Sequence, residues 1–113
     1  MKVEILELAK EELEDAVQYY NLQQVGLGTR FKNEIKKAIK RISLHPKLYP
    51  KVKDNIRRCI LHTFPYSIFY VLFEEENFIL ILSIAHQHRK PFYWVNRIRK
   101  SPKSEEKNSY GSD

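Results

Sequence analysis

Cations, imidazoles and aromatic rings gather at the end of one apolar stretch of this chain. The run ILILSIAHQHRKPFYW, residues 79–94, begins as a strand that avoids water and continues directly into His86, His88, Arg89 and Tyr93. Side chains of these types can hold a phosphate, move a proton or stack on a base. The end of a strand holds them more rigidly than a free loop would. We therefore predict that any action on a polyanion takes place here.

Two adjacent arginines lie in a second predicted strand, over residues 55–62. Because neighbouring side chains in a strand point to opposite faces, Arg57 and Arg58 must diverge. In one interpretation, one arginine pairs with an acidic side chain and the other extends into solvent. In the other, Arg58 shares a face with Ile60 and His62, and its guanidinium holds a phosphate through two hydrogen bonds.

The two histidines share one face at the end of the last predicted strand. A His-x-His pair can bind a metal, but no third or fourth ligand follows at a recognisable spacing, so we expect neither a metal nor a cofactor. Histidine is the side chain whose charge most readily changes near neutral pH, so His86 or His88 could transfer a proton or donate a hydrogen bond to a phosphate. Alternatively, both are ordinary side chains at the rim of the sheet.

The aromatic residues after these histidines also have two interpretations. They could stack on a nucleobase, or they could fold back as a hydrophobic cover for the sheet. We expect Phe92 and Trp94 to form such a cover. Tyr93 points the other way if the segment is extended, so it is the aromatic residue expected to contact a ligand.

Size and composition favour one basic, cytoplasmic domain. The chain has 113 residues, a net charge of +6 and a pI near 9.4, which would attract nucleic acid, an acidic protein or an anionic membrane. A single cysteine, Cys59, permits no internal disulfide and indicates a reducing compartment. No signal peptide is visible, and no apolar run approaches the roughly 20 residues of a membrane span, so no membrane association is expected.

Hydrophobic periodicity predicts the order of the elements. Acidic residues interrupt the apolar stripe of a first helix, and lysines lie mostly off the stripe of a second. The expected elements are a strand at 2–7, a helix over 9–20, a break at 25–28, a helix from Thr29 that Pro46 ends, a basic loop at 45–54, and strands at 55–62, 66–73 and 77–85.

This β-α-α-β-β-β order predicts an α+β domain over residues 1–99, with two antiparallel helices packed on one face of a mainly antiparallel four-stranded sheet. Strand 77–85 is apolar at nearly every position, so both of its faces need cover. The helices can cover one face only. The other needs segment 91–99 or another protein, and we expect a partner protein. Residues 100–113 are expected to be a polar disordered tail.

Four segments, taken in order, resemble the RelE/ParE superfamily, the toxin halves of type II toxin-antitoxin modules. They are VQYYNLQQVGLGTRFKNEI, HPKLYPKV, IRRCILHTFPYSIFYVLF and ILSIAHQHRKPFYW, and the resemblance covers about residues 1–97. It implies the α+β fold reached above and a function in arresting growth. It also implies a cognate antitoxin laid along the sheet and helices, which would supply the missing cover.

The superfamily contains two activities, so the resemblance leaves the cellular target unassigned. RelE-like members cut messenger RNA on the ribosome without a metal, by attack of the RNA 2′-hydroxyl on the adjacent phosphate. ParE-like members bind DNA gyrase and block replication. In an RNase, Arg58 and Arg89 would hold the phosphate, His86 or His88 would act as acid or base, and Tyr93 would position the RNA. As a gyrase inhibitor, the protein would need no catalytic set.

Three departures from the RelE-like pattern bear on this choice. Ile60, Ser67 and Gln87 stand where that group has a lysine and two arginines. The loss should weaken stabilisation of a pentavalent phosphate, since each donor can contribute roughly 3–4 kcal/mol. His86 and His88 could compensate. These departures favour a ParE-like assignment slightly, and a non-toxic member that only binds its antitoxin is a third possibility.

Overall fold

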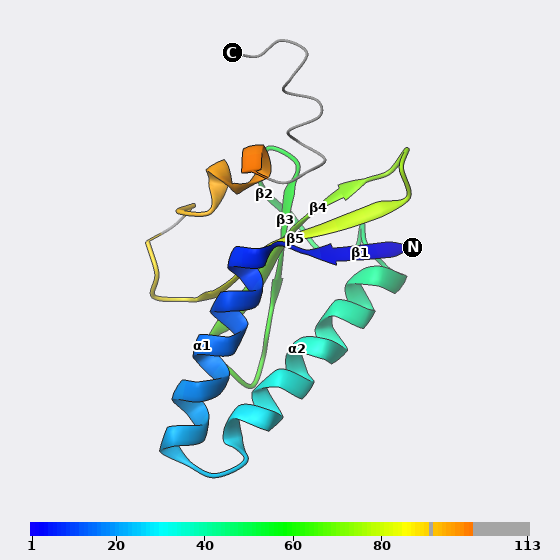
Figure 1. The fold of residues 1–113 in the computed structure, drawn as a ribbon. Helices are drawn as coiled ribbons and strands as arrows, with labels where there is room; N and C mark the ends of the chain where they lie inside the picture. The colour runs from blue at the N-terminus through cyan, green and yellow to red at the C-terminus, as the bar shows by residue number, and fades with distance from the viewer. Residues whose placement is uncertain (91, 101–113) are drawn as a thin grey trace.

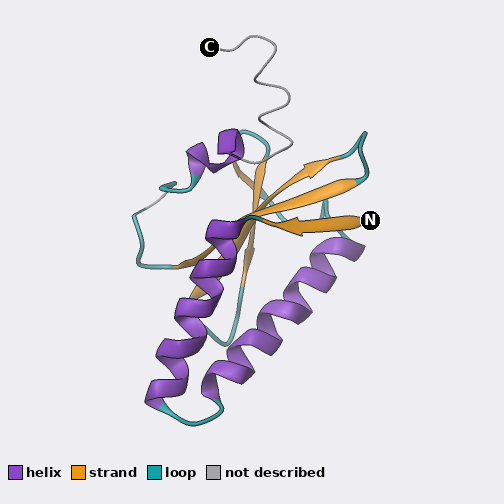
Figure 2. Ribbon diagram, in the orientation of Figure 1, coloured by secondary structure: helices purple, strands orange, loops and turns teal. Residues whose placement is uncertain are grey.

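The computed structural model describes residues 1–90 and 92–100 of the 113-residue chain (Figure 1). Nearly all of the predicted tail, 100–113, therefore lies outside the described residues. Strands and helices follow the predicted order (Figure 2). The elements are β1 (Lys2–Ile5), α1 (Glu7–Gln23), α2 (Leu27–Leu44), β2 (Lys51–Lys53), β3 (Ile56–Ile60), β4 (Tyr66–Phe73), β5 (Phe78–His86) and the short 3-10 helix η1 (Val95–Lys100).

The sheet has five strands in the order β1-β5-β4-β3-β2. β1 runs parallel to β5, and all other neighbours are antiparallel. The α+β prediction is thus confirmed, except that the sheet has five strands instead of four. The additional strand, β2, lies within the predicted loop 45–54 and pairs with β3 at the edge of the sheet. Three residues are too few to show a period of two, so this strand left no signal in the sequence.

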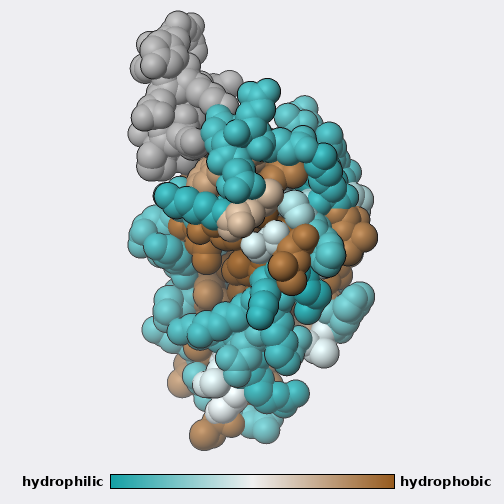
Figure 3. Space-filling view, turned by 90° about the vertical axis from the view of Figure 1, so that its right-hand side faces the viewer, coloured by the Kyte–Doolittle hydropathy of each residue, from teal (hydrophilic) through white to brown (hydrophobic). Residues whose placement is uncertain are grey.

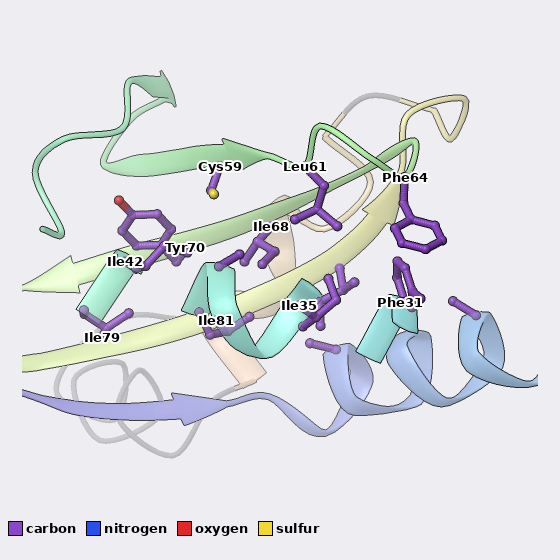
Figure 4. Packing of buried hydrophobic residues seen from close by; sticks show 14 of the residues in the cluster. Phe31, Ile35, Ile42, Cys59, Leu61, Phe64, Ile68, Tyr70, Ile79 and Ile81 are labelled. Atoms are coloured by element: carbon purple, nitrogen blue, oxygen red, sulfur yellow. The ribbon is translucent and has the colours of Figure 1, made fainter. Parts of the chain in front are cut away.

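The two helices form a hairpin that packs on one face of the sheet. The apolar stripe of α2 is buried there, because residues three and four apart lie on the same side of a helix. Figure 4 shows Phe31 of α2 facing Phe64, which follows β3, and their ring centroids lie 5.1 Å apart. Cys59 is buried in the same core. The sheet residues in this core include Ile68, Tyr70, Ile79 and Ile81.

Gly28 allows the two helices to approach closely at their connected ends. A Cβ at this position would lie 2.2 Å from the carbonyl oxygen of Val17 and 2.6 Å from Cγ of Asn21. The Gly28 amide also donates a hydrogen bond of 2.7 Å to Oδ1 of Asn21. The backbone of α1 must therefore move to accommodate any larger residue here.

We expect Gly28→Ala to lower the free energy of unfolding by about 1–3 kcal/mol, the usual cost of forcing a group into a packed site. Urea unfolding should show a lower midpoint with an unchanged slope. Thr29→Ala, at the neighbouring exposed position, is the control and should change the free energy by less than about 0.5 kcal/mol. A G28A protein as stable as the parent would contradict the close approach.

The second face of the sheet is covered by the chain itself. Leu80 and Leu82 of β5 pack with Trp94, whose side chain is only 1% exposed. The ring centroids of Trp94 and Phe69 lie 4.3 Å apart. The expectation that a partner protein covers this part of the sheet is therefore wrong. An indole buries more apolar area than most side chains, so one residue after the last strand is enough to close the middle of this face.

Exposed apolar side chains remain at the two ends of the helical hairpin. Leu22 and Val25 are exposed at the turn between the helices, and Leu44 and Leu48 are exposed at the end of α2 and just beyond it. Hydrophilic side chains cover most of the face drawn in Figure 3, with hydrophobic areas between them. None of the helices in the described residues has the length and apolar character needed to cross a membrane.

Candidate functional site

A groove of about 400 Å³ lies on the second face of the sheet, between the strands and the residues that follow β5, here called the C-terminal segment. Four of the five predicted site residues line it: Arg58 from β3, His86 at the end of β5, and Arg89 and Tyr93 beyond it. The fifth, His88, does not line it. Residues from two strands and from the segment after them thus come together, as the adjacency of β3, β4 and β5 requires.

The two adjacent arginines of β3 have different surroundings. Arg57 donates hydrogen bonds to the carbonyl oxygens of Lys47 and Tyr49, at 3.3 and 2.7 Å, and so holds the loop before β2. One interpretation expected one of the two arginines to pair with an acid, but no salt bridge of Arg57 is found among the described residues. Arg58 points to the opposite face, and its Nε is buried without a hydrogen-bond partner among the described residues. An unpaired buried donor costs about 1–3 kcal/mol, so an anionic ligand that accepted this bond would be bound favourably.

The groove contains fewer cationic residues than the RelE-like pattern would place in it. Its cations are Arg58, Arg89 and Lys90. All three departures from that pattern line the same groove, namely Ile60, Ser67 and Gln87. The three neutral residues therefore lie among the cations of the groove, and they make it less positive than that pattern.

A hydrogen bond fixes the tautomer of His86. The backbone amide of His88 donates to Nδ1 of His86 at 3.0 Å, and the two rings stack with their centroids 5.1 Å apart. A nitrogen that accepts a hydrogen bond carries no proton, so the proton of the neutral imidazole is on Nε2. His86 therefore presents an N–H donor. No group of three or more histidine, cysteine, aspartate or glutamate side chains that could hold a metal occurs in the described residues.

The hydroxyl of Tyr93 is engaged by the protein. It donates a short hydrogen bond to Oε2 of Glu12 and lies 3.2 Å from Oγ of Ser83. Burial, and then the hydrogen bond to Glu12, raise the pKa of Tyr93, so the phenol stays protonated at neutral pH. Residues 92–94 form a turn, so the extended segment, on which the expected direction of Tyr93 was conditional, is not formed. The Tyr93 ring contacts two guanidinium groups, whose carbons lie 4.0 Å (Arg89) and 5.1 Å (Arg97) from the ring centroid.

Phe92 and Trp94 differ in their exposure. Trp94 forms the predicted cover, whereas Phe92 is 42% exposed and lines the groove. Its φ of 62° lies in the left-handed region, which a bulky residue adopts only under constraint. Nζ of Lys53 lies 5.8 Å from the Phe92 ring centroid. The prediction that Phe92 is part of the cover is wrong, and its ring is an exposed aromatic surface beside the cations.

Glu12 and Arg97 were missed by sequence reasoning. Nη1 of Arg97 lies 2.9 Å from Oε1 of Glu12, and Nη2 lies 3.0 Å from Oε2. Both side chains are largely buried, at 15% exposed for Glu12 and 13% for Arg97. A signal was present: Glu12 is three residues after Ala9 and four before Ala16, which places it on the buried stripe of α1. This ion pair joins α1 to the C-terminal segment.

Comparison with known proteins gives the family. The model of the family described as "ParE toxin of type II toxin-antitoxin system, parDE" matches residues 3–91. The chain therefore belongs to this family, and the predicted membership of the RelE/ParE superfamily is confirmed. It is a ParE/RelE-like toxin of the toxin-antitoxin class. No curated protein sequence matches the chain.

Solved structures support the fold. The chromosomal ParDE system from P. aeruginosa is similar with a TM-score of 0.67 and 17% identity, over 76% of this chain and 95% of that one. The intact E. coli RelBE toxin-antitoxin complex gives 0.61 and 15%, over 78% and 98%. The isolated E. coli RelE toxin gives 0.60 and 16%, over 88% and 98%. At these identities the likeness shows a shared fold.

Proposed function

We propose that this toxin arrests growth by cutting ribosome-bound messenger RNA without a metal, in the groove lined by Arg58 and Arg89, and that a cognate antitoxin neutralises it. The observation that carries the proposal is the groove that Arg58, whose Nε is buried without a hydrogen-bond partner among the described residues, lines together with a second arginine and an exposed aromatic ring. A phosphodiester satisfies the arginines and its base can stack on the ring. The antitoxin follows from the family and from relatives solved as toxin-antitoxin complexes.

Cleavage in this groove is a transesterification within the RNA. The RNA 2′-hydroxyl attacks the adjacent phosphorus, a 2′,3′-cyclic phosphate forms, and the bond to the 5′ oxygen breaks. Arg58 and Arg89 stabilise the additional negative charge on the phosphate oxygens. The Nε2–H of His86 donates a hydrogen bond to a phosphate oxygen, the proton of the 2′-hydroxyl passes to water, and the leaving 5′ oxygen takes a proton from water. The ring of Tyr93 positions the RNA beside Arg89.

A second candidate function is inhibition of DNA gyrase by binding alone. The neutral residues Ile60, Ser67 and Gln87 in the groove favour it, because they replace cations that the RelE-like pattern uses to stabilise the transition state. A toxin that only binds its target has no need of such stabilisation. The match to the ParE family model agrees with this candidate as well.

Induction of the toxin in growing cells separates the two candidates. We expect primer extension on a reporter messenger RNA to show new ends within translated codons within minutes, because translating ribosomes present the substrate. Supercoiling of a relaxed plasmid by purified gyrase should be unaffected by the purified toxin. Intact messenger RNA together with blocked supercoiling would favour the gyrase candidate instead. If neither effect is observed, both candidates are refuted. The remaining possibility is then a member that only binds its antitoxin.

A further inference from the structure

Every oxygen of the Glu12 carboxylate is occupied. Oε1 accepts hydrogen bonds of 3.0 Å from the Ser83 hydroxyl and the Ile84 amide, in addition to the Arg97 guanidinium. Oε2 accepts from Tyr93 and from the second terminal nitrogen of Arg97. Arg97 also donates to the carbonyl oxygen of Leu82 at 3.0 Å. This paired set of donors neutralises a carboxylate that would otherwise be an uncompensated charge in a largely buried position.

Arg89 lies between this carboxylate and the groove. Its side chain lines the groove and also a second hollow of about 350 Å³, whose lining includes Glu12 and Asp15 of α1. The Tyr93 ring lines both hollows too, and it contacts Glu12 through its hydroxyl and Arg89 through its face. No carboxylate forms a salt bridge with Arg89 in the part of the chain that the structure describes. Arg89 can therefore turn toward the groove or toward the acidic hollow.

We infer that Arg97 is a positioning residue, which neutralises Glu12 and so leaves the Arg89 guanidinium free to face the groove. Attraction between charges is strong where little water intervenes, and an arginine paired through two hydrogen bonds satisfies a carboxylate more fully than a more distant cation. If Arg97 were absent, Glu12 would draw Arg89 into the acidic hollow and away from a phosphate. This inference rests on the proposed function, in which RNA is the ligand of the groove.

The test measures binding of a fluorescein-labelled, unstructured single-stranded RNA by fluorescence anisotropy. Arg89→Ala should weaken binding about tenfold, as expected for the loss of one charge-assisted hydrogen bond. Arg97→Gln should weaken it by a similar factor, about fivefold, although Arg97 does not line the groove. Adding Glu12→Gln to R97Q removes the attracting charge, so the double variant should return to within about twofold of the parent.

If Arg97 had only a structural role, Glu12→Gln would not restore RNA binding to R97Q. The second substitution would then remove a further native contact and leave binding as weak as in R97Q or weaker, which would overturn the inference. Glu14→Gln, the same charge change at an exposed position of α1, is the matched control and should not restore binding to R97Q. In an R89A background, R97Q should have no further effect, because the group it acts through is gone.

Two outcomes of the binding measurement separate failure of this inference from failure of the proposed function. Unchanged RNA binding by R89A alone would refute RNA as the ligand of the groove, and the inference with it. Weakened binding by R89A without rescue of R97Q by E12Q would refute the inference alone. Thermal unfolding verifies that each variant is folded. If R97Q does not fold, Arg97→Lys keeps a cation beside Glu12, and it should bind RNA within about twofold of the parent, whereas binding as weak as R89A would contradict the role of charge.

Discussion

Replacement of Arg58 and Arg89 together by alanine should abolish growth arrest by this toxin. In the proposed mechanism each guanidinium stabilises charge that develops on the phosphate, and loss of one such donor typically costs about 10²–10³ in rate. The double variant should therefore be slower than the parent by about 10⁴ or more, below the rate needed to deplete messenger RNA. Colony counts after induction measure the effect and should equal those of cells that carry the empty vector.

The matched control removes two cations from a surface outside the groove. Arg30 and Lys36 are exposed residues of α2, and alanine at both positions should leave growth arrest intact. Immunoblots of the induced cells show whether both variants accumulate to the level of the parent. Growth arrest by an R58A/R89A protein present at that level would refute the assignment of the groove as the active surface.

Replacement of Trp94 by alanine should destabilise the fold more than Gly28→Ala does. The indole is 1% exposed and packs on Phe69 and on the apolar face of β5. Truncation of a buried tryptophan typically lowers the free energy of unfolding by about 3–5 kcal/mol, which is a large fraction of the stability of a small domain. Urea unfolding followed by circular dichroism measures the loss. Binding of a hydrophobic dye should rise as Leu80 and Leu82 become accessible.

Phe92→Ala provides the comparison for Trp94→Ala. Phe92 is two residues away in the same turn but is 42% exposed, so its truncation should change the free energy of unfolding by less than about 1 kcal/mol. The same substitution should weaken RNA binding if the exposed ring stacks on a base. A W94A protein as stable as F92A would mean that the C-terminal segment does not stabilise the second face of the sheet.

The parts of the fold that the sequence could predict depend on periodicity. The α2 stripe of Phe31, Ile35 and Ile42 repeats at helical spacing, and all three are fully buried against the sheet. The continuous apolar run of β5 predicted a strand that is buried on both faces, as the structure shows. Strict alternation in a strand also separated Arg57 from Arg58, but it did not determine which of the two faces the groove, and the structure places Arg58 there.

What the sequence could not predict depends on contacts between distant segments. Glu12 and Arg97 are separated by 85 positions, and neither belongs to a motif. The turn at residues 92–94 directs Tyr93 toward Glu12 and Trp94 into the core, whereas alternation in an extended segment placed Tyr93 toward a ligand. A periodicity rule applies only while the chain remains in one regular element, and the described C-terminal segment has none until η1.

Three residues of the groove are neutral where the RelE-like pattern has cations, so few positive charges are available in it. With Ile60, Ser67 and Gln87 in the lining, Arg58 and Arg89 carry most of the charge that a phosphate would meet. The orientation of Arg89 therefore matters more in this protein than in a groove with several spare cations. For this reason the Glu12–Arg97 ion pair, although Arg97 does not line the groove, is expected to influence what the groove can bind.

An NMR titration of the ¹⁵N-labelled toxin with a short single-stranded RNA tests most directly whether this groove binds RNA. The Nε–H resonance of Arg58 should shift strongly, because this buried donor gains its first acceptor, and the amides of His86 and Arg89 should shift with it. Amides along the exposed lysines of α2, such as Lys36, should not move. Shifts confined to α2, with the Arg58 resonance unchanged under saturating RNA, would contradict the proposed site.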